Sequence, residues 1–533
     1  MDRVRFLSDP PEVTLVNAFA RPFDGAVAAA RTCYSSKGII TPEEVAGDGA
    51  PEAERERRLA RRDDLAKDVY AAGHHTTYQH AHFQFALRNV SRQLIWSFLH
   101  AHPWYNSEQT SQRYVGVKPG SFAVPPLQGR ALEVYRAAAE RQLSAYRELG
   151  QLLRPAAARA FFNTFRGRES QPERWEKAIG KRAMEVARYV LPVATFSTLY
   201  HTISAVTLFR YRRLACSFDA PSEQLLVVDA MVEEVLRHDP GYAAVLEEPL
   251  PLEETPEAQA LERLGAVFAP DSSTSAKFRS EFDASLGGYV SRLVDRKARG
   301  EDLLAASVRE LLGVPAGVLS DDDAIALALD PASNRLFGEA LNLTEHSKLS
   351  RALHHPAYTF RKKLSHTADS QDQRHRMTPA SRPILSAYLT DEPDYITPKL
   401  LQGTGGAEQI FKTVMQQTWE AIRELRGLGV PDEFRAYLLP SAVALRFTES
   451  ADLAALRHKL AMRLCFNAQE EIWQASVDEA LQIREVEPRI GRWLLPPCGH
   501  RVRAGAKPIC PERERFCGVL VWRQNVADYN RLF

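Results

Sequence analysis

Two short basic motifs in this 533-residue chain have the residue types that hold oxyanions. One is Ser111-Gln112-Arg113-Tyr114 and the other is Arg374-His375-Arg376. An arginine stays charged at any working pH, and its planar fork pairs bidentately with carboxylates and phosphates. In a closed site such donors also stabilise negative charge as it develops during a reaction. The motifs therefore indicate chemistry on an anionic substrate or cofactor.

The overall composition is that of an ordinary globular protein, with 45% hydrophobic and 25% charged residues. A net charge of +1 gives no whole-chain reason to expect a nucleic acid partner. No stretch has the eighteen or so uncharged apolar residues that a membrane helix needs, and the first residues lack the apolar core of a signal peptide. We therefore expect no nucleic acid partner, no membrane partner and a cytoplasmic location.

The same order of elements occurs twice along the chain. The alternating run at 82–87 predicts a strand with one buried face, and amphipathic patterns predict long helices over 131–153 and 174–190. Short strands are expected to open the two halves, at 4–7 and at 290–294. The dipeptide Leu191-Pro192 recurs as Leu439-Pro440.

An ordered recurrence with a period of about 270 residues favours domain duplication over chance similarity of two mixed domains. The fold class is therefore α+β, with two tandem domains that each pack a mixed antiparallel sheet against long helices. The predicted bounds are a first domain at 1–250, a linker rich in Pro, Glu and Ser at 251–285, a second domain at 286–490 and a Cys/His-containing extension at 491–533.

Both halves resemble flavin-dependent thymidylate synthases. In the first half the resemblance is carried by Arg31-Thr32-Cys33-Tyr34-Ser35-Ser36, Gly73-His74, His80, Phe83-x-Phe85, Ser91-Arg92, Ser111-Gln112-Arg113-Tyr114, Pro125-Pro126 and Ala187-Arg188-x-x-Leu191-Pro192. In the second half it is carried by Gln371, Arg374-His375-Arg376, Leu439-Pro440, Arg457-His458, Ala461-Met462-Arg463 and Ala468-Gln469-x-Glu471-Ile472. Each motif is weak alone, but this order and spacing are specific.

The resemblance implies an enzyme of dTMP synthesis. In the family, reduced FAD carries hydride from NADPH, and a methylene group passes from methylenetetrahydrofolate to C5 of dUMP. The family's sites lie at subunit junctions of a homotetramer, so two copies of this duplicated chain would form a homodimer that acts as a pseudo-tetramer. Two other interpretations remain open: a catalytically silent nucleotide-binding homologue, and a flavin enzyme that transfers a different group.

The resemblance also implies roles for individual residues. Arg374, His375 and Arg376 would contact the flavin, Gln371 would bind the nucleotide, and Arg463 would polarise the uracil, with Arg463 and Arg374 as the catalytic residues. Ser111, Arg113, Ser381 and Arg382 match substrate-binding positions, Arg188 would pair with the phosphate, and His74 and His80 match positions that line the flavin pocket. Without the family frame, a structural role is the favoured interpretation of His74, His75 and His80, and Arg113 and Arg188 could be surface salt-bridge partners.

Each half departs from the family pattern in a different place. The first half has Ala101-His102-Pro103 where the triplet belongs and Ala215 at the position of the uracil-facing arginine. The second half has Asp452 where the family has an asparagine, which would place like charge near a flavin phosphate. Because the losses are partly complementary, we expect composite sites that take the triplet and Arg463 from one half and Ser111, Arg113 and Arg188 from the other.

The C-terminal extension contains Cys498, His500, Cys510 and Cys517 in a loop-rich segment. Three thiols and an imidazole suit a closed tetrahedral zinc site, which would serve as a structural clasp because four protein ligands leave no open position. The spacing is not that of a standard finger or ribbon, so free cysteines are an equal alternative.

Overall fold

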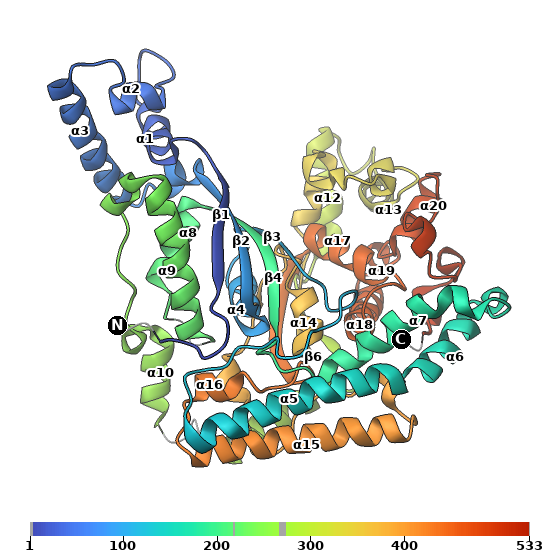
Figure 1. The fold of residues 1–533 in the computed structure, drawn as a ribbon. Helices are drawn as coiled ribbons and strands as arrows, with labels where there is room; N and C mark the ends of the chain where they lie inside the picture. Colours follow the sequence, from blue (N-terminus) through green and yellow to red (C-terminus); the bar gives the residue numbers. More distant parts are fainter. Residues whose placement is uncertain (1–3, 217–218, 266–272, 532–533) are drawn as a thin grey trace. The chain divides into compact units, whose positions relative to one another are not determined.

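The computed structural model describes residues 4–216, 219–265 and 273–531 and contains two four-stranded antiparallel sheets (Figure 1). The strands of the first sheet, in the order β1-β2-β4-β3, are β1 (Glu12–Ala18), β2 (His82–Ser91), β4 (Phe196–Ser204) and β3 (Asn106–Gln109). The second sheet repeats the order as β5-β6-β8-β7, with β5 (Ser291–Arg296), β6 (Ala357–Ser365), β8 (Ala444–Asp452) and β7 (Ala380–Ser381). The α+β class and the tandem arrangement are therefore confirmed.

Helices accompany both sheets, and one of them packs in the same way in each repeat. In the first repeat they are α1 (Pro22–Thr32), α2 (Pro42–Ala46), α3 (Glu52–Ala71), α4 (Arg92–His100), α5 (Gly129–Leu152), α6 (Arg154–Thr164), α7 (Glu176–Ala187), α8 (Ala205–Arg213) and α9 (Pro221–His238). In the second they are α12 (Gly300–Leu312), α13 (Asp321–Leu329), α14 (His366–Asp372), α15 (Gly406–Gly427), α16 (Asp432–Ala436), α17 (Leu453–Arg463), α18 (Glu470–Val486), α19 (Pro488–Gly491) and α20 (Pro497–Arg503). Helix α9 packs beside β1 as α18 packs beside β5. Within the described ranges, no helix is both long enough and apolar enough to cross a membrane.

The alternating run at 82–87 forms β2, as predicted. Phe83, Phe85 and Leu87 are buried on one face of this strand, while His82 is exposed. The strand therefore supplies one wall of the first hydrophobic core, and Phe360 and Leu364 of β6 are buried in the same alternating manner.

The expected strand at 290–294 is confirmed as β5, but the one at 4–7 is wrong. The first strand of the sheet is β1, which begins at Glu12. Phe6 instead packs edge-on against the rings of Phe434 and Tyr437, with centroids 6.3 and 6.0 Å away. Packing of this aromatic ring against the end of α16 and the residue that follows it takes the place of strand pairing.

The segment predicted as a linker contains two helices among its described residues. Helix α10 (Pro256–Leu264) begins after Thr255, whose hydroxyl accepts a hydrogen bond from the backbone of Ala258, and α11 covers Ser273–Leu286. Residues 266–272, between these two helices, lie outside the described part of the chain.

The chain folds into two compact units that do not follow the two repeats one to one. Unit 1 combines residues 1–141 and 192–268 with residues 420–438 of the second repeat. Unit 2 combines residues 269–419 and 439–533 with residues 142–191 of the first repeat. Each sheet is therefore completed by a helical segment that comes from the other repeat.

One buried contact recurs in both units where the exchanged segment enters. In unit 1 the carboxylate of Glu223 accepts hydrogen bonds from the backbone N–H and hydroxyl of Ser91 (2.7 and 2.5 Å) and from the Tyr437 hydroxyl (2.6 Å). The Ser91 hydroxyl also caps α4 by accepting a bond from the backbone of Leu94 at 3.0 Å. Burial raises the pKa of Glu223.

In unit 2 the carboxylate of Glu471 accepts the same bonds from the backbone and hydroxyl of Ser365, the N-cap of α14, and from the hydroxyl of Tyr189. Both tyrosines come from the opposite repeat and stand shortly before its Leu-Pro sequence. We call this contact of a glutamate with a serine and a tyrosine the repeated triad. It joins each exchanged segment to the unit that contains the serine and the glutamate.

Replacing Tyr437 with phenylalanine removes one donor from a fully buried carboxylate. We expect a loss of about 1–3 kcal/mol in the free energy of unfolding, measured by chemical denaturation. Tyr189→Phe should cost a similar amount, and the two effects should add because the pairs share no partner. Tyr200→Phe is the control, because Tyr200 is 55% exposed; equal effects for all three would contradict the structural role of the triad.

Candidate functional site

Three of the predicted site residues come together in unit 2, at the ends of α14 and α17. Arg463, the last residue of α17, donates from Nε to Nε2 of His375 at 2.8 Å. Its Nη2 donates to the backbone oxygen of Gln371 at 2.9 Å. The guanidinium fork therefore joins the Arg-His-Arg triplet to the end of the helix that precedes it.

The contact requires a neutral imidazole at His375. An imidazole nitrogen accepts a hydrogen bond only when it carries no proton. Burial, followed by the positive charges of Arg463 and Lys459, lowers the pKa of His375 well below its usual value. The ring centroid of His458 lies 6.1 Å from that of His375. Arg374 and Arg376, the sequence neighbours of His375, are exposed. The group thus presents fixed positive charge around a neutral acceptor.

A buried network of five charged side chains underlies this cluster. Nζ of Lys362 lies 2.7 Å from carboxylate oxygens of Glu449 and Glu479 and 3.2 Å from Asp372. Nζ of Lys459 pairs with Asp372 at 3.0 Å and with Glu449. All five side chains are at most 2% exposed.

The network fixes the two helix ends that carry the cluster. Asp372 ends α14 and Lys459 lies in the last half of α17, so their ion pair holds the two helices at a set spacing. The coulombic effect of the two lysines on Asp372 overcomes the desolvation that opposes it, and its pKa is well below the usual range. Burial opposes the charge of Lys362, but the carboxylates of Asp372, Glu449 and Glu479 outweigh it and raise the pKa of this lysine. These residues therefore position Arg463 and His375 rather than forming part of the open site.

Ser381 and Arg382, the substrate-binding positions predicted in the second half, differ in their exposure to solvent. Ser381 is exposed on β7. Arg382 is 3% exposed, donates from Nε to both carboxylate oxygens of Asp369 at 3.0 and 2.8 Å, and lies over the ring of Phe447. The guanidinium of Arg382 is thus engaged in a buried ion pair next to the network.

The Ser111-to-Tyr114 motif forms a turn in unit 1. The hydroxyl of Ser111 accepts a hydrogen bond from the backbone of Arg113 at 3.3 Å, and the Arg113 guanidinium lies 5.7 Å from the Tyr114 ring. The intervening Gln112 is 9% exposed, and its Nε2 has no hydrogen-bond partner among the described residues. This turn therefore keeps a buried amide donor beside an arginine.

The two predicted histidines lie at the ends of one short 3-10 helix, η1 (His75–Gln79). His74 precedes it and His80 follows it, and both side chains are exposed. His75 between them is half-buried, with Nε2 3.1 Å from the backbone oxygen of Tyr70. His75 therefore has a structural contact, whereas the side chains of His74 and His80 are open to solvent.

An aromatic cluster in the first repeat occupies the positions of the ion network. The shift that carries β4 to β8 carries His201 to Glu449 and Tyr211 to Lys459. The Tyr211 hydroxyl lies 2.9 Å from Nε2 of His102 and 3.0 Å from Nε2 of His201. Phe98 stacks on Tyr211 at 4.6 Å. His102, from the altered triplet, is thus part of a packed aromatic group rather than a cationic one.

This aromatic cluster predicts acid sensitivity. Burial lowers the pKa of His102 to about 4 and that of His201 to about 3. Both rings are neutral in the folded chain, whereas in the unfolded chain they take up protons near the ordinary histidine pKa of about 6.5. Stability therefore falls as the pH drops below that value, by about 2 kcal/mol for each ring between pH 7 and pH 5.

Chemical denaturation across this range checks the prediction. His201→Gln and His102→Gln should each flatten the dependence of unfolding free energy on pH. His238→Gln, at an exposed position, should leave the slope unchanged. A slope that the two buried-site variants do not alter would contradict the neutral state of these rings.

Arg188 belongs to unit 2, although it comes from the first repeat. It lies in the 3-10 helix η4 (Arg188–Val190), directly before Tyr189 of the repeated triad. Its side chain is 4% exposed, its Nε donates to the backbone oxygen of Glu185 at 3.2 Å, and its charge acts to lower the pKa of Glu471 against the larger effect of burial. The exchange of segments therefore puts this predicted phosphate ligand into the unit that carries the triplet.

The acidic side chain of Asp452 has two contacts within the second repeat. Its carboxylate caps α17 by accepting from the backbone of Ala455 at 2.8 Å, and it lies 2.8 Å from Nδ1 of His354. His354 in turn reaches Glu345 at 3.3 Å. Asp452 thus caps the N-terminus of α17, the helix that ends in Arg463.

The predicted zinc ligands lie in α20 and in the segment that follows it. Among residues 4–216, 219–265 and 273–531, no group of three or more His, Cys, Asp or Glu side chains is placed to hold a metal ion. His500 is 1% exposed and stands 6.0 Å from the ring of Phe337. Cys498, Cys510 and Cys517 are free, and the pKa of Cys498 is raised first by burial and then by Cys465 and the other two thiols.

Comparison with known proteins identifies the family. The sequence model described as thymidylate synthase complementing protein, Thy1, matches residues 14–241 and 292–489, one segment in each repeat. Because these segments cover most of the chain, the protein belongs to the Thy1 family, as the sequence motifs predict.

Similar proteins include two curated relatives. The flavin-dependent thymidylate synthase of Geobacter sulfurreducens is 29% identical over 185 residues, which cover 34% of this chain and 74% of the relative. That of Clostridium tetani is 26% identical over 233 residues, covering 43% and 84%. A crystal structure of the UMP/dUMP methylase PolB from Streptomyces cacaoi, bound with 5-Br dUMP, aligns with 21% identity and a TM-score of 0.30, covering 45% of this chain and 96% of that one.

Proposed function

We propose that this protein is an FAD-dependent thymidylate synthase. It transfers a one-carbon group from methylenetetrahydrofolate to dUMP, with reducing equivalents from NADPH passed through FAD, and forms dTMP in the cytoplasm. Membership of the Thy1 family supports the class of reaction. The observation that carries the proposal is the contact of Arg463 with His375 and Gln371, because it sets a fixed cation beside the triplet that the family uses.

The residues around this contact fit an electron-rich flavin and a nucleotide. Arg374, His375 and Arg376 would hold the flavin, whose bound ring supplies hydride-transfer chemistry. Gln371 would bind the nucleotide, and the Arg463 guanidinium would stabilise negative charge that develops on the uracil oxygens. A neutral His375 accepts the hydrogen bond from Arg463 without adding repulsion between cations.

The proposed site is composite, with one site for each chain. Arg188, in the same unit as the triplet, would pair with the dUMP phosphate, and Ser111 and Arg113 of the first repeat would hold dUMP. The first repeat has Ala215 where Arg463 stands in the second, so it lacks the cation for a second site. Two chains would form the homodimer that corresponds to the family's tetramer.

Product formation by the full-length chain tests the proposal. The purified protein is supplied with FAD, dUMP, methylenetetrahydrofolate and NADPH, and dTMP is measured by chromatography. We expect dTMP only when all four are present, and strong loss in Arg374→Gln and Arg113→Gln separately. Arg299→Gln is the control, because its side chain is 82% exposed.

The outcomes separate this proposal from its alternatives. A protein that binds FAD and dUMP without making dTMP would favour a silent homologue or a different transferred group. A colourless protein that binds neither would exclude flavin chemistry altogether. Equal activity of Arg374→Gln, Arg113→Gln and the control would contradict the composite site.

A further inference from the structure

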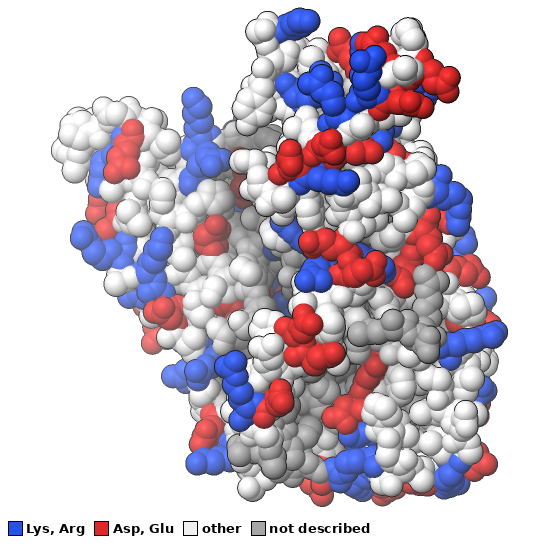
Figure 2. Space-filling view, turned by 90° about the vertical axis from the view of Figure 1, so that its left-hand side faces the viewer, with Lys and Arg blue, Asp and Glu red and all other residues white. Residues whose placement is uncertain are grey.

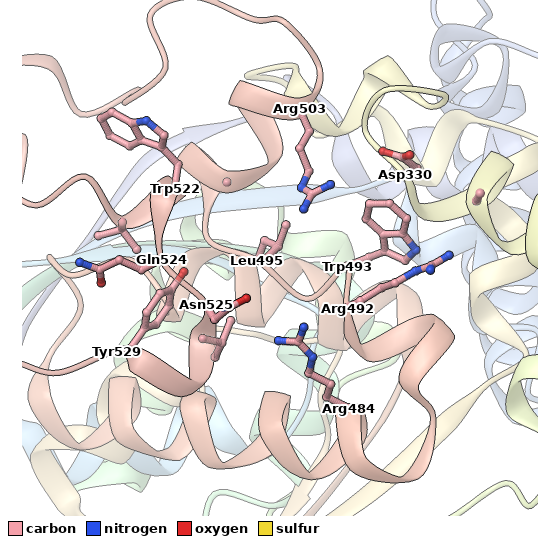
Figure 3. A pocket seen from close by; sticks show the side chains of 14 residues that line it. Asp330, Arg484, Arg492, Trp493, Leu495, Arg503, Trp522, Gln524, Asn525 and Tyr529 are labelled. Carbon is pink, nitrogen blue, oxygen red and sulfur yellow. The ribbon is translucent and has the colours of Figure 1, made fainter.

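A cavity of about 470 Å³ lies in unit 2, lined mainly by the chain that follows the family-matched region. Its walls come from the end of α13, the end of α18, the turn after α19, helix α20 and the tail from 521 to 529 (Figure 3). Volumes of 300–1,000 Å³ are typical of small-molecule sites. We call this cavity the C-terminal pocket; it shares no residue with the Arg463 cluster.

Three arginines give the C-terminal pocket its charge. Arg484, Arg492 and Arg503 line it, and among the described residues none of them has an ion-pair partner within 4 Å. Figure 3 shows the guanidinium groups of Arg484 and Arg503 extending from opposite sides toward the space between them. The single acidic lining residue is Asp330, whose carboxylate accepts from the backbone of Ala332 at 3.0 Å. The surplus of positive charge favours an anion with more than one charge.

Aromatic rings form a second part of the lining. Trp493 is 6% exposed, and its Nε1 has no hydrogen-bond partner among the described residues. The guanidinium groups of Arg492 and Arg503 lie 4.9 and 5.2 Å from its ring. Trp522 and Tyr529 also line the pocket, and the pKa of Tyr529 is raised by burial, so its phenol is a donor at neutral pH.

These features together select one class of ligand. Arginine forks bind phosphate oxygens bidentately, while aromatic side chains stack on heterocyclic bases. A buried indole N–H without a partner needs an acceptor, because an unsatisfied buried donor is costly. The side-chain amides of Gln524 and Asn525, both exposed in the lining, can meet the polar edge of a base.

We propose that the C-terminal pocket binds a nucleoside 5′-phosphate as an accessory ligand, with the phosphates on Arg484, Arg492 and Arg503 and the base between the aromatic side chains. The function of the protein would then include a nucleotide site separate from the one that holds its substrate. The proposal does not depend on which reaction the Arg463 cluster performs.

Isothermal titration of the full-length chain tests this site. The probes are UMP, AMP, UTP and ATP, with uridine and inorganic pyrophosphate to separate the contributions of ring and phosphate. Each is titrated into the Arg113→Gln background as well, so that binding at the proposed dUMP site does not obscure the result. We expect at least one nucleotide to bind, and each of Arg492→Gln and Arg503→Gln to raise its Kd by about tenfold or more.

Matched variants keep the test decisive. Arg299→Gln should bind normally, and Arg503→Lys should recover part of the affinity because it retains the charge. Quenching of tryptophan fluorescence by the nucleotide should diminish in Trp522→Phe. The proposal is overturned if no nucleotide binds, if binding is lost only in Arg113→Gln, or if the two arginine variants bind as the parent does. It is also overturned if uridine or pyrophosphate binds as tightly as the nucleotides.

Discussion

Replacement of Arg463 by glutamine is expected to lower kcat for dTMP formation by about 10²–10³-fold, the usual effect of removing one well-placed donor to developing charge. Glutamine keeps a hydrogen-bonding end but loses the positive charge and the fork that reaches His375 and Gln371 at once. Lysine at this position should be intermediate, because it keeps the charge without the bidentate geometry. The measurement is steady-state formation of dTMP at saturating dUMP.

A structural role alone would give a different pattern. The melting temperature of Arg463→Gln should stay close to that of the parent, because the side chain bonds at the margin of the buried network and not within it. Arg299→Gln provides the activity control. If kcat of Arg463→Gln falls by less than about threefold while the protein stays folded, the proposed role of this guanidinium is wrong.

Replacement of Lys362 by methionine is expected to cost about 3–5 kcal/mol in the free energy of unfolding. The substitution leaves three buried carboxylates, those of Asp372, Glu449 and Glu479, to be balanced by Lys459 alone. An uncompensated buried charge is the largest penalty that a single substitution in this network can cause. Chemical denaturation measures the loss, and Glu479→Gln in the same chain should restore part of it.

The adjacent residue provides a matched control. Lys363 has the same side chain and the neighbouring position on β6, but it is 27% exposed and pairs with Asp283 at 2.7 Å. Surface pairs of this kind contribute about 1 kcal/mol or less, so Lys363→Met should be mild. Similar effects of the two substitutions would mean that the buried network is not what holds α14 against α17.

Local sequence patterns predicted several strands and the duplication of this fold. Alternation at 82–87 identified β2, and the recurrence of ordered motifs identified the duplication that the two sheets confirm. The proximity of Gln371, His375 and Arg463 followed from the family resemblance, since no pattern of spacing connects residues nearly a hundred positions apart. The opening strand at 4–7 was wrong because burial of Phe6 outweighs its local preference for a strand.

The exchange of segments and the buried network were not visible in the sequence. Nothing in residues 142–191 or 420–438 shows which sheet they pack against, because both repeats offer the same Ser and Glu partners to an incoming tyrosine. The alternation of residues in β6 gave a weak indication of the network, because it places Lys362 on the same buried face as Phe360. A buried lysine needs carboxylate partners, but the sequence does not say which ones.

The surroundings of the predicted zinc ligands were not visible in the sequence for a related reason. Short spacings among Cys498, His500 and Cys510 suggested ligands, but helix α20 carries His500 into the core beside Phe337, whereas electrostatic interaction links the thiols to Cys465 from the preceding repeat. The direction in which a helix turns each side chain decides which residues meet.

The most direct test of the central claim is the number of dUMP molecules bound per chain. In equilibrium dialysis of labelled dUMP with the FAD-loaded protein, we predict one site per chain, with strongly weakened affinity in Arg113→Gln and normal affinity in Arg299→Gln. Two equivalent sites per chain, or a single site whose affinity is unchanged in Arg113→Gln, would contradict a composite site built around the second repeat.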